Sequence, residues 1–184
     1  MPGSRKTGER MSEIELPRTF RQLLAALPLD FRRTVVEALL TDKEAKGAAQ
    51  EALGTVAALR KMRPQSLSLF KRPERIQLVL SALGQPAMET SAMQALQVWF
   101  LRQGRPLMSQ LLDAWKVPHT DGELADDVVF PELTSDQVLE AAREAAKSHP
   151  KAAVAAYLGY NHVAPPSDSW DGKFEAALRE LLEA

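Results

Sequence analysis

Residues 91–116 read SAMQALQVWFLRQGRPLMSQLLDAWK, and this stretch decides the fold. Its first part has helical spacing and is apolar on nearly every side, with Trp99 and Phe100 at its centre. A helix of that kind belongs in the middle of a protein, with neighbours on several sides. We therefore expect Trp99 and Phe100 to be among the most buried residues.

The second part of this stretch begins at a glycine and a proline. Gly104 stands where a left-handed helix cap would lie, and Pro106 suits the first position of a new helix. Leu107, Leu111 and Trp115 then form an apolar stripe. We interpret residues 91–116 as a central helical hairpin, in which Leu111 and Trp115 pack near Trp99 and Phe100.

Helical periodicity continues on both sides of this hairpin. Two four-residue segments, 41–44 and 134–137, have the form of a capping box, and both predict the start of a helix. The connector at residues 64–72 carries Leu67, Leu69 and Phe70, which we expect in the core. The predicted fold class is all-α, a compact irregular array of eight or nine short helices around the central hairpin.

Composition limits the domain organisation and the compartment. Residues 1–15 are polar and lack periodicity, so we expect a disordered tail followed by a single helical domain at residues 16–184. No apolar run approaches the roughly 18 residues of a membrane span, and no apolar signal segment follows the first residues. The chain also lacks cysteine. We expect a soluble, cytoplasmic protein.

Charge is divided unevenly along the chain, although the net charge is only −1. Residues 1–116 hold 18 basic and 11 acidic residues, whereas residues 117–184 hold 5 and 13. Three interpretations remain open. The two halves pack together and neutralise each other, the basic half binds an acidic partner, or copies of the chain associate head to tail.

The basic segment at residues 60–75 concentrates this charge, with Glu74 as its only acid. Cations also gather at helix C-termini for electrostatic reasons, so a solvated helix end is one interpretation. Contact with phosphates of a nucleic acid or another polyanion is the alternative, although no nucleic-acid motif is visible and the pI is near 6.3. The candidate binding residues are Arg60, Lys61, Arg63, Lys71, Arg72 and Arg75.

An acidic loop at residues 119–127 is the candidate metal site. Carboxylates and one histidine within so short a loop are ligands for a hard metal ion. An EF-hand register built on Gly122 places only one acid correctly, so that motif is excluded. A solvated surface turn at Asp121-Gly122 is the alternative. The candidate ligands are His119, Asp121, Glu123, Asp126 and Asp127, with His149 or His162 brought in by folding.

Three functional hypotheses follow. The first is an interaction or adaptor module without enzymatic activity, whose partner is another protein or the chain itself. The second is a polyanion or nucleic-acid binder that uses residues 60–75, and the third is a metal-dependent enzyme that uses residues 119–127. The sequence has no GxSxG elbow, no GxGxxG and no P-loop, so no cofactor is expected.

Overall fold

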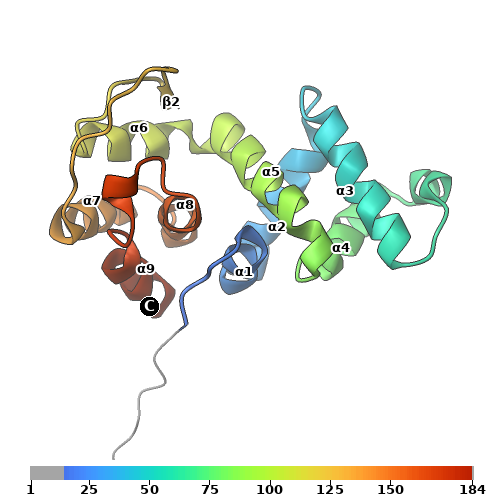
Figure 1. Ribbon diagram of the computed structural model, residues 1–184. Coiled ribbons are helices and arrows are strands. Elements are labelled where there is room, and N and C mark those ends of the chain that lie inside the picture. The colour runs from blue at the N-terminus through green and yellow to red at the C-terminus, as the bar shows by residue number, and fades with distance from the viewer. Residues whose placement is uncertain (1–14, 184) are drawn as a thin grey trace, which may run out of the picture.

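Nine α-helices lie within residues 15–183, the part of the chain that the computed structural model describes (Figure 1). The all-α prediction is therefore confirmed. The predicted disordered tail lies, apart from Glu15, outside the described residues. The helices are α1 (Phe20–Ala26), α2 (Leu29–Thr41), α3 (Lys46–Leu59), α4 (Arg72–Ala82), α5 (Glu89–Trp99), α6 (Arg105–Ala114), α7 (Ser135–Ser148), α8 (Lys151–Val163) and α9 (Glu175–Glu183).

Short elements join these helices. They are the 3₁₀ turns η1 (Pro64–Leu69), η2 (Pro86–Met88) and η4 (Asp168–Trp170), the π-helical segment η3 (Phe100–Gly104), and the antiparallel strands β1 (His119–Thr120) and β2 (Glu123–Leu124). The two strands form a hairpin around the turn predicted at Asp121-Gly122. Both turn residues have positive φ, as a type I′ hairpin turn requires.

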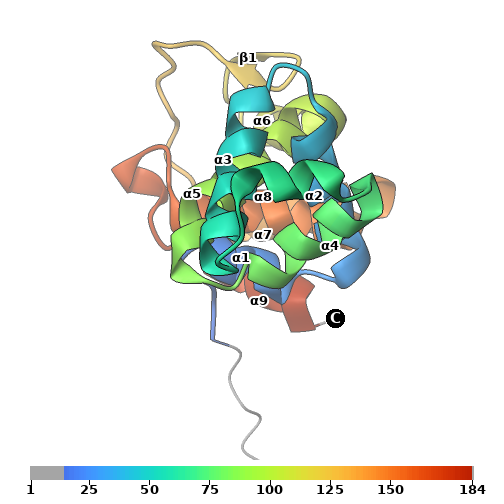
Figure 2. The ribbon, with the colours of Figure 1, turned by 90° about the vertical axis from the view of Figure 1, so that its right-hand side faces the viewer.

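The helices form two groups that share one hydrophobic core (Figure 1). In the first group α2 packs against α4 and α5, and α3 crosses over α4 and α5 (Figure 2). In the second group α8 packs against α7 and α9, with α6 above it. Helix α1 contacts both α5 and α8 and so connects the groups. None of the described helices is long and apolar enough to cross a membrane.

The central element is a bent continuous helix, and the predicted hairpin is wrong in this respect. Helix α5 passes through η3 into α6 without leaving helical conformation, because Gly104 has φ −91° rather than a left-handed value. The two parts therefore follow one another along the chain, and each packs against a different group of helices. Helix α5 packs on α1, α2 and α3, whereas α6 packs on α7 and α8.

A wider π-helical turn at η3 explains how the helix accommodates Pro106. Proline has no N–H and its ring crowds the preceding turn, which ends or kinks a regular α-helix. In the i→i+5 pattern of η3, the Leu101 carbonyl would need the missing N–H of Pro106. Arg105 satisfies it instead, because its Nε donates to the Leu101 carbonyl at 2.8 Å.

Gly104 leaves room for the aromatic rings beside it. A Cβ at this position would lie 3.1 Å from both Phe100 Cδ1 and Trp99 Cζ3. The rings of Trp99 and Phe100 therefore pack directly on the backbone of the next turn. Both residues are buried, as predicted.

Trp115 reaches these two rings through α8 rather than directly. Tyr157 of α8 meets Phe100 edge to face at 5.3 Å between ring centroids and stacks on Trp115 at 6.2 Å. Burial raises the pKa of Tyr157 far above its ordinary value. Leu111 and Trp115 are buried as predicted, but α8 lies between Trp115 and the aromatic pair.

Helix α8 is the most enclosed helix of the described chain. Every residue from Ala153 to Gly159 is buried, and most of these side chains are small. Leu23 of α1 packs directly on Gly159, so closely that a Cβ at Gly159 would overlap the leucine side chain. This glycine therefore sets the distance between α1 and α8.

Two local predictions differ in outcome. The capping box at Thr134–Gln137 is confirmed, and Leu133 and Val138 are both buried beside it. The helix start predicted at Thr41–Glu44 is wrong, because α2 continues to Thr41 and α3 begins only at Lys46. The Asp42 side chain instead accepts the backbone N–H groups of Glu44 and Ala45 and shapes the connecting loop.

Candidate functional site

The basic segment at residues 60–75 forms one end of the molecule, which we call the basic end (Figures 1 and 2). The chain leaves α3 at Arg60, turns through Lys61 with φ 53°, forms η1 and enters α4 at Arg72. This path brings the cations of two helix ends together. The six candidate binding residues therefore share one region of the surface.

Two of these six cations are engaged within the protein. Arg60 donates to the hydroxyl of Ser81 at 2.6 Å, and Arg72 forms an ion pair with Glu37 of α2. Glu74, the acid of the segment, accepts the backbone N–H of Lys71 and so caps α4. None of these three contacts was predicted, since each depends on how the helices pack or on the local cap.

The other four cations make no ion pair with any residue in the range 15–183. Lys61, Arg63 and Lys71 are exposed. Arg75 is half-buried and lines a shallow pocket between α3 and η1, together with Leu53 and Leu67. The basic end therefore presents uncompensated positive charge to solvent.

One apolar side chain projects from the basic end. The prediction that all three apolar residues of the connector enter the core is wrong for Leu69, which is 85% exposed. In a 3₁₀ turn residues three apart share a side. Leu67 is buried and Phe70 is half-buried, so Leu69 between them points outward.

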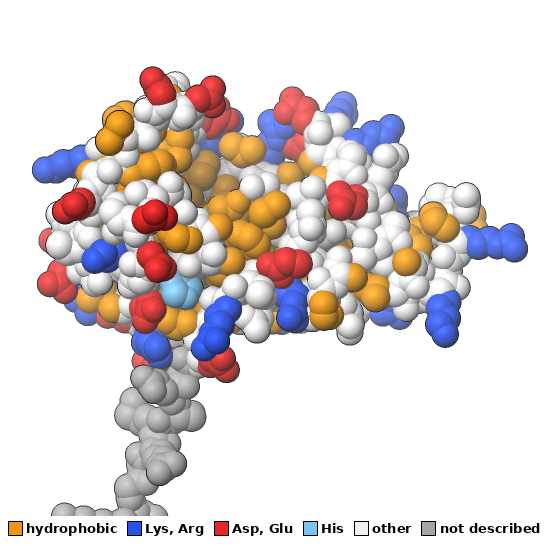
Figure 3. All heavy atoms as spheres, in the orientation of Figure 1, with side chains coloured by type: hydrophobic (Ala, Val, Ile, Leu, Met, Phe, Trp, Pro, Cys, Tyr) orange, Lys and Arg blue, Asp and Glu red, His pale blue; other side chains and the backbone are white. Residues whose placement is uncertain are grey.

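The opposite end of the molecule is acidic. We call residues 125–144, which comprise the loop after β2 and most of α7, the acidic end (Figures 1 and 3). On the face that Figure 3 shows, acidic side chains gather at this end, and the charged side chains that project from the basic end are Lys and Arg. The exposed acids of the acidic end that make no ion pair with described residues are Asp126, Asp127, Glu132, Asp136 and Glu140.

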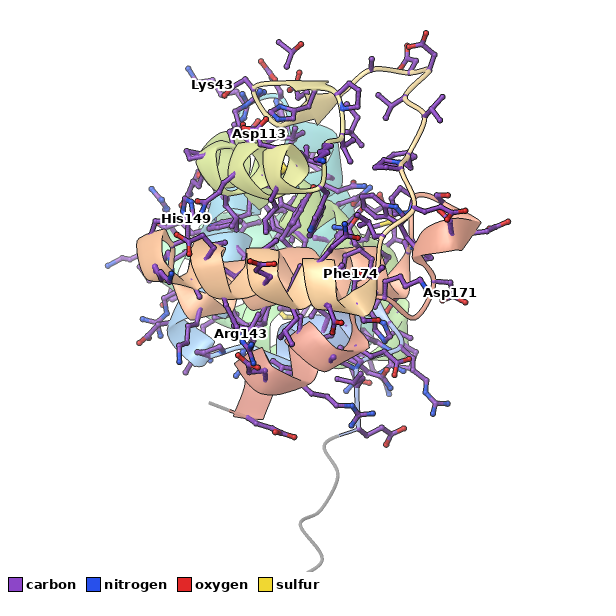
Figure 4. The ribbon with its side chains drawn as sticks, turned by 90° about the vertical axis from the view of Figure 1, so that its left-hand side faces the viewer. Lys43, Asp113, Arg143, His149, Asp171 and Phe174 are labelled. Carbon is purple, nitrogen blue, oxygen red and sulfur yellow. The ribbon has the colours of Figure 1, made fainter. Side chains whose placement is uncertain are left out.

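Other charges of α7 are paired. Arg143 lies on the side of the helix that faces α9 (Figure 4) and makes a two-pronged ion pair with Glu180 at 2.6 and 2.8 Å. The hydrogen bonds from Arg143 lower the pKa of Glu180. Glu144 pairs with Lys147. The unpaired acids therefore lie at the loop and the first turns of α7.

The acidic loop does not assemble the predicted metal site. Arg105 forms ion pairs with Asp121 and Glu123, so these two carboxylates are drawn to a cation. Asp126 and Asp127 are exposed further along the loop. Across the described residues, no group of three or more histidine, cysteine or acidic side chains is arranged to hold a metal ion.

The three histidines occupy separate places. His119 Nδ1 accepts the backbone N–H of Gly122 at 3.1 Å, and its Nε2 lies 3.1 Å from Asp113. His149, at the end of α7 (Figure 4), lies 2.9 Å from Gln110. His162 is half-buried in the last turn of α8. The structure therefore does not bring His149 or His162 to the acidic loop.

Two arginines of the bent helix were missed by the sequence reasoning. Arg102, in η3, forms ion pairs with Asp42 and Glu44, and its hydrogen bond lowers the pKa of Asp42. Arg105 reaches the β-hairpin on the other side. The widened turn thus connects the α2–α3 loop with the hairpin. No sequence signal identifies these pairs, because their acids are far away along the chain.

Internal pairing leaves much of the charge imbalance at the surface. Arg72 and Arg102 pair with acids of the N-terminal half, and Arg143 and Lys147 pair with acids of the C-terminal half. Arg105 pairs across the two halves, with Asp121 and Glu123. Because the basic and acidic ends lie at opposite extremes of the molecule, they do not neutralise each other within one chain.

Comparison of the chain with protein-family models, with curated proteins and with solved structures found no match.

Proposed function

We propose that this protein is an interaction or adaptor module that binds other proteins through its charged ends. The observation that supports this proposal is the group of unpaired cations at the basic end, opposed by the unpaired acids of the acidic end. Uncompensated charge of one sign attracts surfaces of the other sign and speeds their encounter. Internal ion pairs would have removed that attraction.

The arrangement of the basic end favours a protein surface as partner. Three exposed cations and an exposed leucine share this end, so it offers charge and an apolar contact together. Interfaces between proteins combine an apolar centre with a polar rim. A partner with an acidic rim and a small apolar depression complements this pattern.

Capture from a cell lysate tests this proposal. The immobilised wild-type protein is compared with a basic-end variant, Lys61→Glu, Arg63→Glu and Lys71→Glu, by quantitative mass spectrometry of the bound proteins. We expect acidic proteins in the wild-type sample, released by salt, and their loss from the variant. Salt releases them because contacts between exposed charges are screened.

A matched control carries the same change in charge at another place. Arg33→Glu, Lys43→Glu and Lys46→Glu alter three exposed cations of the same half outside the basic end. This control should recover the same partners as the wild type. Equal losses in both variants would refute a role for the basic end, and so would no salt-sensitive partner at all.

A second candidate function is binding of a polyanion such as a nucleic acid. It is favoured by the same four free cations, which share the basic end. Four phosphate contacts on duplex DNA would give a slope of about −3.6 in log affinity against log salt. A gel-shift titration at low salt with duplex and single-stranded probes tests this alternative, and no shift would exclude it.

A further inference from the structure

Two apolar side chains stand out from the described surface. Leu69 and Val129 are each 85% exposed, whereas no other large apolar side chain in residues 15–183 is more than 49% exposed. Single exposed apolar residues are common on protein surfaces. These two differ because they share nearly full exposure and lie at the two charged ends.

The charges beside them are opposite. Leu69 lies in the connector between Arg63 and Lys71, both of which are exposed and unpaired. Val129 follows Asp126 and Asp127, which are likewise exposed and unpaired. Each apolar side chain is therefore flanked by charges that complement those beside the other.

Both side chains are presented by an anchored backbone. Next to Val129, the Phe130 ring packs edge to face on Trp170 at 5.2 Å between centroids. Trp170 Nε1 also donates to the carbonyl of Pro131 at 2.7 Å. At the other end, buried Leu67 holds η1 against the protein. An anchored backbone loses less conformational entropy when a contact forms.

Within one chain these two residues cannot meet, because η1 and the loop after β2 lie at opposite extremes of the fold (Figure 1). We propose that the chain associates head to tail with a second copy, so that Leu69 of one copy contacts Val129 of the next. Arg63 and Lys71 then face Asp126 and Asp127 across the contact. This inference rests on the proposed function and names a second copy of the chain as the partner.

The geometry determines the kind of assembly. A contact between two different surfaces is heterologous, so each pair of copies retains one free basic end and one free acidic end. Association then continues into rings or open chains. The contact is small and is rimmed by screened charges, so it belongs to the weak, transient class and depends strongly on concentration and salt.

Sedimentation velocity over about a hundredfold range of protein concentration, at low and at high salt, tests the association. The expected result is a mean mass that rises with concentration at low salt and returns to that of a monomer at high salt. A monomer at every concentration in low salt would overturn the inference.

Complementation between two variants tests the contact itself. The variant with an altered basic end is Leu69→Ser with Lys71→Glu, and the variant with an altered acidic end is Val129→Ser with Asp127→Asn. Each retains one intact end, so each alone should be monomeric. Their equimolar mixture retains one matching pair of ends and should form a heterodimer that grows no further. Self-association of either variant at the wild-type level, or a mixture that stays monomeric, would overturn the inference.

A control variant and the lysate capture distinguish the possible failures. Leu29→Ser with Lys43→Glu makes comparable changes outside both ends and should associate like the wild type. Circular dichroism verifies that all variants are folded. If the wild type is monomeric but its basic end still captures acidic proteins, self-association fails and the proposed function stands. If capture fails as well, both are refuted.

Discussion

Gly159→Ala probes the contact between α8 and α1, the helix that connects the two groups. In a helix interior, alanine is favoured over glycine by about 0.8–1.0 kcal/mol. Here the added methyl group would overlap Cδ1 of Leu23 and lie 3.0 Å from its Cδ2. Because Leu23 is fully buried, its side chain would have to move against close-packed neighbours. Overpacking of this kind costs about 1–3 kcal/mol, so the net change is a destabilisation of up to about 2 kcal/mol.

The sign of this effect should reverse when Leu23 is shortened. Leu23→Ala alone costs about 2–5 kcal/mol because it leaves a cavity. In that background Gly159→Ala fills part of the cavity and retains its helix preference, so it should stabilise by about 1 kcal/mol. Urea denaturation followed by circular dichroism gives the four free energies of the cycle.

Gly54→Ala is the matched control, because this glycine also lies inside a helix but a Cβ there meets nothing within 4 Å. It should stabilise the wild type by up to about 1 kcal/mol. If Gly159→Ala stabilises the wild type as much as Gly54→Ala does, the close packing of α1 on α8 is refuted.

Three further predictions concern the bent helix and its partners. Trp99→Ala removes a buried ring and should lower the free energy of unfolding by about 3–5 kcal/mol in urea denaturation. Asp126 is exposed, so Asp126→Ala should change that free energy by no more than about 0.5 kcal/mol. Equal losses in the two variants would contradict the buried, central position of Trp99. Arg102 lowers the pKa of Asp42 from its ordinary 3.8. The charged Asp42 therefore stabilises the fold above that pH, and this stabilisation is lost as the pH falls through the lowered pKa. The stability difference between wild type and Asp42→Asn should therefore shrink below about pH 4 in thermal melts, and a constant difference would argue against the pair. Arg105→Met should speed amide hydrogen exchange in residues 119–124, since Arg105 holds the hairpin through Asp121 and Glu123; unchanged exchange there would show that the hairpin does not need it.

The sequence predicted best what depends on neighbouring residues. The capping box at Thr134–Gln137 combines a local hydrogen-bond exchange with adjacent apolar contacts, so four residues are enough to identify it. Burial of Trp99 followed from the periodicity of a single helix. The fold class, which sums many such local signals, was therefore predicted correctly.

Prediction failed where packing overrides a local signal. Gly104 and Pro106 together indicate the end of one helix and the start of another. The structure instead widens one turn, because two aromatic rings need the surface of Gly104 and Arg105 supplies the hydrogen bond that Pro106 lacks. The enclosed position of α8 was likewise not apparent, since its alanines are compatible with any environment.

The candidate site was predicted only in part, for a related reason. The basic segment is visible in the sequence, but which of its cations remain free depends on Ser81 and Glu37, which belong to other helices. The exposure of Leu69 depends on the 3₁₀ geometry of η1, which the connector sequence does not specify.

The continuous path from α5 through η3 to α6 has a mechanical consequence. The two helix groups are attached to successive parts of one bent rod, so torque applied to one group is transmitted to the other. If η3 relaxed to a regular α-helix, α6 would rotate by about 100°, the angle that one residue occupies in an α-helix. The wider turn therefore sets the orientation of one group relative to the other, although each group has its own internal packing.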